Sequence, residues 1–168
     1  MADRNYSEKI ANAIKNFLIN DDWHFSFDEE KGRFTFGISL KSKLNRVDCK
    51  VIVNNYGYTV YGNSPITPEA NDKTMMMEMA DFLHRANFGL RNGCFELDMN
   101  DGELRYKSYV DCENLIPSQA VIENSIVMPA RMIDRYAPGI LSIIFTGGNA
   151  RDCIDQIEGN GSGSTVGQ

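Results

Sequence analysis

The chain has 168 residues and a formal net charge of −6. Its length suits one domain with a single core, and its acidic balance argues against nucleic acid or an anionic membrane as a partner, because both attract basic surfaces. The longest apolar run, residues 140–145 interrupted by Ser142, is far shorter than the ~20 residues that a spanning helix needs. Since the first residues show no basic segment leading into an apolar one, we expect a cytoplasmic protein.

Apolar residues at helical spacing over residues 7–19 predict an amphipathic first helix, with Asn5 or Ser7 as its N-cap. Alternating apolar and polar residues then predict four consecutive strands. These runs cover residues 23–27, 34–40, 47–53 and 58–61. The four strands form an antiparallel meander with one apolar face and one polar face, on which Ile52 and Tyr61 are the outward-pointing apolar exceptions.

The apolar face of such a sheet needs helices to cover it. Thr67-Pro68 resembles an N-cap followed by proline at the first helical position, which predicts a helix that ends near Gly89. Ser118 is the expected N-cap of a further helix, in which Pro129 predicts a kink or a break. Two further helical segments are expected, one over residues 138–145 that begins at proline and one over residues 150–157 that Asn149 caps.

The stretch from Gly93 to Lys107 predicts a β-hairpin between these helices. Asp101-Gly102 is the expected two-residue turn, because type I′ turns need positive φ at both central positions. This turn pairs Glu96 with Lys107 and Asp98 with Arg105 across the strands. The apolar face of the hairpin then carries Phe95, Leu97, Met99, Leu104, Tyr106 and Ser108.

The fold class predicted from these elements is α+β, with helices covering one face of a single antiparallel sheet of about five to six strands. The elements follow in the order α-β-β-β-β-α-β-β-α-α. We expect one domain over residues 1–158 and a flexible tail over residues 159–168, since the tail is rich in Gly and Ser and has nothing to bury.

Three segments together resemble the YbjN family of bacterial sensory-transduction regulators. They are residues 85–90 (Arg-Ala-Asn-Phe-Gly-Leu), residues 93–107 and residues 132–139 (Met-Ile-Asp-Arg-Tyr-Ala-Pro-Gly). The resemblance implies a fold similar to type III secretion chaperones, in small acidic proteins that dimerise and bind other polypeptides. It implies no catalytic residues, because the family has no agreed enzymatic activity.

The sequence offers no group of residues that predicts catalysis or metal binding. Four well-separated cysteines without a Cys-x-x-Cys pair favour free, buried thiols. The two histidines, His24 and His84, fit a surface or structural role, with His24 on the polar sheet face. The run from Asp98 to Glu103 fails as a calcium loop, because Tyr109 falls where the bidentate glutamate belongs. We therefore expect no cofactor.

These observations favour a non-catalytic protein-binding module, chaperone-like or regulatory, that acts in bacterial signalling, stress or secretion. The expected partners are another polypeptide and a second copy of the chain, as a homodimer. The predicted binding surface is the polar sheet face or the methionine-rich helix, and its residues are Ile52, Tyr61, Met75, Met76, Met77 and Met79. Most of these methionines are expected to be core. The alternative is a small-ligand sensor or enzyme with an aromatic pocket formed by Trp23, Tyr56, Tyr58 and Tyr61.

Overall fold

The computed structural model describes residues 5–113 and 115–159, and these form four helices and one six-stranded antiparallel sheet. The predicted α+β class and element order are confirmed. The predicted tail lies outside the described residues, except for Gly159. The elements are α1 (Glu8–Asn20), β1 (Phe25–Asp28), β2 (Arg33–Ser39), β3 (Arg46–Val53), β4 (Gly57–Asn63), α2 (Lys73–Asn87), β5 (Cys94–Leu97), β6 (Leu104–Asp111), α3 (Gln119–Thr146) and α4 (Ala150–Gly159).

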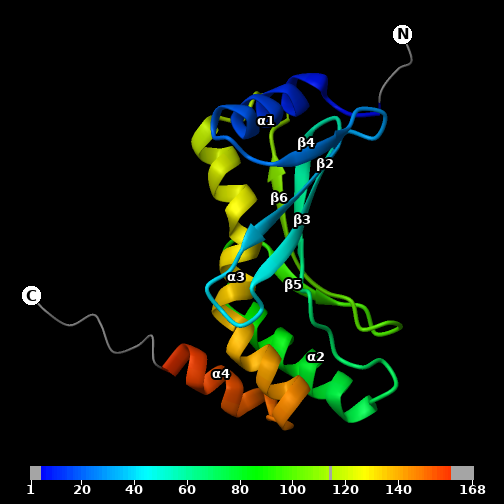
Figure 1. Ribbon diagram of the computed structural model, residues 1–168, viewed down its shortest axis with the longest axis vertical. Helices are drawn as coiled ribbons and strands as arrows, with labels where there is room; N and C mark the ends of the chain where they lie inside the picture. Colours follow the sequence, from blue (N-terminus) through cyan, green and yellow to red (C-terminus); the bar gives the residue numbers. More distant parts are fainter. Residues whose placement is uncertain (1–4, 114, 160–168) are drawn as a thin grey trace, which may run out of the picture.

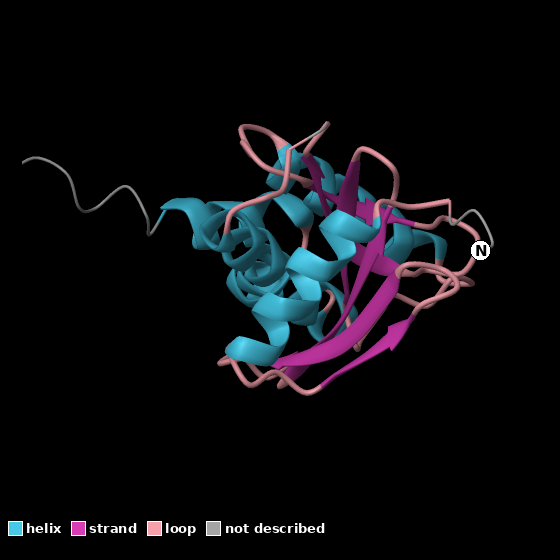
Figure 2. Ribbon diagram, turned by 90° about the horizontal axis from the view of Figure 1, so that it is seen from above, coloured by secondary structure: helices cyan, strands magenta, loops and turns pink. Residues whose placement is uncertain are grey.

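The strands lie in the order β1-β2-β3-β4-β6-β5, so β6 pairs with β4 and leaves the short β5 at the edge. Figure 1 shows α3 running along the sheet, with α1 at one end of the molecule and with α2 and α4 together at the other. In Figure 2, seen from above, the strands lie to one side of most of the helices. Alternation along the strands places one face toward these helices, as the sequence predicted. The largest fully buried side chains of this core include Phe34, Tyr58, Phe82, Tyr106 and Tyr136.

The central hairpin forms, but its predicted register is wrong by two residues. Glu96 lies opposite Arg105 and not opposite Lys107, and Asp98 has left the strand. The connection is longer than two residues, because the Asp98 N–H donates to the carbonyl of Glu103 (2.9 Å) across it. Gly102 does have positive φ (81°), and a Cβ there would strike the carbonyl oxygen of Pro68. A shift of two residues leaves the side chains of the strand residues on their predicted faces. The predicted position of Met99 on the apolar face is wrong, because Met99 lies beyond the end of β5 and is 52% exposed.

Two predicted helix boundaries are corrected. The second helix begins at Lys73 with Asp72 as its N-cap, and not at Thr67, because the Asp72 carboxylate accepts the Met75 N–H (2.9 Å). The third helix is one continuous element that includes Pro129 and Pro138, without the predicted break or restart. Tertiary burial along the whole of α3 outweighs the hydrogen bonds that the two prolines remove.

Candidate functional site

The outer face of the sheet is a polar surface that the strands organise. Within the described residues no helix covers it, and Ser26, Thr35, Asp48, Ile52 and Tyr109 are exposed on it. The registers align its side chains in rows across the strands. One row contains Ser26, Thr35, Lys50, Tyr61, Lys107 and Cys94, and the next contains Asp28, Arg33, Ile52, Thr59 and Tyr109.

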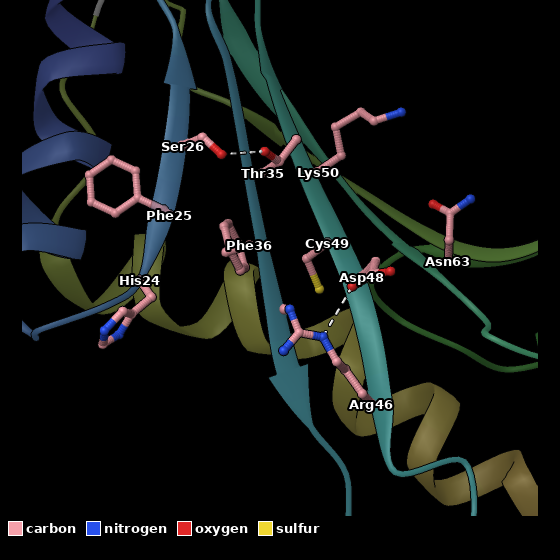
Figure 3. Close-up of a pocket in the computed structure, with 11 residues that line it drawn as sticks. His24, Phe25, Ser26, Thr35, Phe36, Arg46, Asp48, Cys49, Lys50 and Asn63 are labelled. Carbon is pink, nitrogen blue, oxygen red and sulfur yellow. Dashed lines mark hydrogen bonds and ion pairs between the residues drawn. The ribbon is translucent and has the colours of Figure 1, made fainter.

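A shallow hollow of about 650 Å³ lies on this face over β1, β2 and β3 (Figure 3). Its polar lining comes from His24, Ser26, Thr35, Arg46, Asp48, Lys50 and Asn63. Because position 37 is glycine, the Arg46 guanidinium lies directly over that backbone, where a Cβ would collide with it. The Arg46 Nε donates to Asp48 (3.2 Å), whereas Lys50 has no ion-pair partner among the described residues.

The β5–β6 end of the same face carries a charged cluster built on Glu96. This carboxylate accepts hydrogen bonds from Arg105 Nε (2.7 Å) and from Lys107 Nζ. The guanidinium of Arg105 also lies over the ring of Tyr61, 4.6 Å from its centroid. Burial raises the pKa of Glu96, but hydrogen bonds and charge from the two cations outweigh burial, and the pKa of Glu96 falls below its usual value.

The structure divides the predicted binding residues between surface and core. Ile52 is 39% exposed and Met77 is 63% exposed, and Tyr61 lies on the outer face beneath Arg105. Met76 and Met79 are buried and Met75 packs against the core. A partner can therefore reach Met77 but not Met76 or Met79 in this conformation, and the outer sheet face becomes the better of the two predicted surfaces.

The four aromatic residues of the alternative pocket do not converge. Tyr58 is fully buried in the core and its hydroxyl lies 2.8 Å from Ser125 Oγ. Trp23 packs edge-to-face on Phe36, while Tyr56 is 66% exposed in a turn. Tyr61 lies on the outer face of the sheet, opposite to the face that carries Tyr58. The predicted aromatic pocket is therefore wrong.

The two predicted histidine positions are confirmed. His24 lines the hollow on the polar face, and His84 lies on α2 beside Arg85. Within the described ranges no three His, Cys, Asp or Glu side chains are placed to hold a metal. In the same ranges no helix is both long and apolar enough to cross a bilayer.

Sequence reasoning did not find a second concave surface, a groove of about 460 Å³ between β2 and α3. Ile38, Leu40, Val127 and Ala130 supply its apolar lining, and Ser39, Lys41, Arg131, Asp134 and Arg135 supply the polar lining. The groove depends on the strand order and on the straight path of α3. No local pattern in the sequence indicates either of them.

A scan against protein-family models finds no match for this sequence, and a search of curated proteins finds none either. The resemblance to the YbjN family and to type III secretion chaperones therefore stays a prediction.

Proposed function

We propose that this chain is a non-catalytic polypeptide-binding module of the bacterial cytoplasm, a chaperone-like or regulatory adaptor that works as a homodimer. The resemblance to the YbjN family supports this proposal. So does the arrangement of the outer face, where neighbouring strands present rows of side chains that no helix of the described residues covers.

One observation carries the proposal: apolar side chains stand in register on the uncovered face of the sheet. Ile52 and Tyr109 are 39% and 47% exposed and lie in the same cross-strand row, with Thr59 between them. Tyr61 lies on the same strand as Thr59, two residues further on. Isolated exposed apolar residues are common, but a row of them on a rigid sheet offers a partner a preformed contact surface.

Photo-crosslinking from the surface itself tests this proposal. A benzophenone amino acid replaces Ile52 in one variant and Arg151, an exposed residue of α4, in a matched control. We expect polypeptide adducts from position 52 that the control lacks, and the further change Tyr109→Asp should suppress them. Equal adducts from both positions, or none from position 52, would contradict binding at this face.

Sedimentation of the purified chain tests the homodimer. We expect twice the mass of the chain at micromolar concentration, and a monomer throughout would remove this part of the proposal.

A further inference from the structure

The edge of the sheet beside the groove is open along the last three of the seven residues of β2. The short β1 pairs only with residues 33–36 of β2, so residues 37–39 extend beyond it. The chain before β1 does not continue alongside, because α1 ends at Asn20 and Trp23 turns in to pack on Phe36. No strand of the described residues therefore lies along this side of residues 37–39.

The hydrogen-bonding groups at this edge face outward. In an antiparallel ladder, successive residues turn their N–H and C=O groups alternately to the two neighbouring strands. The N–H of Leu40 donates to the carbonyl of Asn45 (2.7 Å), on the β3 side. The main chain of Ser39 therefore faces the opposite, open side, where an added strand would meet it.

The groove runs beside this edge, and its wall is a rigid helix. Val127, Ala130, Arg131 and Asp134 follow one another at helical spacing along one side of α3. The Asp134 carboxylate accepts the N–H of Ser42 (2.8 Å) and so fastens the loop after β2 to the helix. Figure 1 shows this loop lying against α3. The edge and the helix are thus held at a fixed separation.

The charge of the groove is opposite to that of the molecule. Three cations line it, Lys41, Arg131 and Arg135, against the single carboxylate of Asp134. All three cations are exposed and none forms a direct ion pair among the described residues, although the charge of Lys41 acts on Asp134. In a chain with a net charge of −6, this leaves a local surplus of positive charge.

We propose that an extended, acidic polypeptide segment binds here as an additional strand on the open edge of β2. The main chain of a residue next to its central position pairs with Ser39, whose side chain points to the outer face. The central apolar side chain then points the other way and lies on Ile38, Leu40, Val127 and Ala130. The residues two positions before and two positions after this central residue point to the same face of the added strand. Acidic side chains at these positions reach Arg131 and Arg135 at the rim of the groove. The occupant is a separate partner and the site is distinct from the outer face, so the inference goes beyond the proposed function.

A short defined peptide tests this geometry directly. The probe is acetyl-Glu-Glu-Val-Glu-Glu-amide with a fluorescent label, and the control replaces every Glu with Lys. We expect the acidic peptide to bind with a dissociation constant of about 1 mM or tighter, and to shift the amide NMR signals of Ser39 and Leu40. No shift at these amides, or equal binding of the basic peptide, would overturn the proposal.

Two matched sets of variants separate strand addition from simple charge attraction. R131E should weaken binding about tenfold, whereas R151E, on α4, should leave it unchanged. N-methylation of alternate peptide nitrogens gives two isomers, of which only the one whose methyl groups face β2 should lose binding. Equal binding by both isomers, or equal losses in R131E and R151E, would overturn the added strand.

The outer-face variant I52D keeps this test independent of the proposed function. It should bind the acidic peptide as the wild type does, even where it abolishes capture of the outer-face partner. Loss of peptide binding in I52D but not in R131E would place the peptide on the outer face and overturn the groove. Competition by the unlabelled protein, together with self-association that R131E abolishes, would make a second copy the occupant and overturn a separate partner.

Discussion

Glu96 shows how one side chain on a sheet face ties stability to pH. Its pKa is depressed by Arg105 and Lys107, which outweigh the opposing effect of burial. A carboxyl group of this kind stabilises the fold fully above its unfolded pKa of about 4.3. It loses that contribution as the pH falls through its lower folded pKa.

We therefore expect Glu96→Gln to lower the free energy of unfolding by about 1 kcal/mol at neutral pH. The effect is modest because Glu96 and its two cationic partners, Arg105 and Lys107, are partly exposed. The difference from the wild type should shrink as the pH falls through the lowered folded pKa of Glu96, because the wild-type carboxylate then becomes protonated. Urea denaturation at neutral pH and at a series of acidic pH values measures this difference. Glu103→Gln is the control, since Glu103 is 44% exposed and its contact with Arg105 is longer (3.2 Å). A pH-independent difference would contradict this account.

Phe95 tests the assignment of faces in the same hairpin. Its side chain is 4% exposed and contacts the rings of Tyr106 and Tyr136 edge-to-face, with centroids 5.0 and 5.3 Å away. Phe95→Ala should cost about 3 to 5 kcal/mol because it leaves a cavity. Lys107→Ala, on the opposite face, should cost about 1 kcal/mol at most. Equal losses in denaturant melts would show that the faces are misassigned.

At the scale of whole elements, local patterns predicted which segments form strands and helices but not where tertiary contacts move their ends. The hairpin register moved by two residues, and Gly102 in its connection lies close to the carbonyl of Pro68, a contact between segments far apart in sequence. The alternation survived, since a shift of two residues restores each face. The start of α2 moved to Lys73, because the carboxylate of Asp72 caps the helix in place of Thr67.

The unbroken α3 predicts an unusual response to removal of a proline. Pro138 is exposed, so its ring adds little packing, and its missing N–H leaves the carbonyl of Asp134 without a helical donor. We expect Pro138→Ala to raise the free energy of unfolding by about 2 kcal/mol in urea denaturation.

Pro129→Ala is the comparison for this change. Pro129 is buried against Gly62 of β4, so replacing it restores a hydrogen bond but removes packing, and its gain should be smaller. A loss of stability in Pro138→Ala would mean that α3 depends on the geometry that proline imposes.

At the scale of the molecule, the sequence predicted both layers of the fold but only part of the candidate surfaces. Ile52 and Tyr61 were predicted on the polar face from alternation alone, because period-two patterning decides the face directly. The exposed position of Tyr109 and the groove beside β2 were not predicted from the sequence. They depend on the pairing of β6 with β4 and on how far β1 extends along β2, which long-range packing decides.

The same layering predicts how the four cysteines react. Cys49, Cys112 and Cys153 are buried on the helix side, whereas Cys94 is partly exposed on the outer face beside Lys107. Burial raises the pKa of the Cys49 thiol to about 12 and also raises that of Cys112, so their reactive thiolate forms are scarce at neutral pH.

With an aromatic disulfide reagent we therefore expect one fast thiol in the native protein and four in denaturant without reductant. Cys94→Ser should remove the fast phase and leave three slow thiols, whose rates follow the opening of the core. Two or more fast thiols would show that the helices do not seal the apolar face. Fewer than four thiols in denaturant would show that a disulfide holds the layers together, and the packing of the core would then no longer account for the fold by itself.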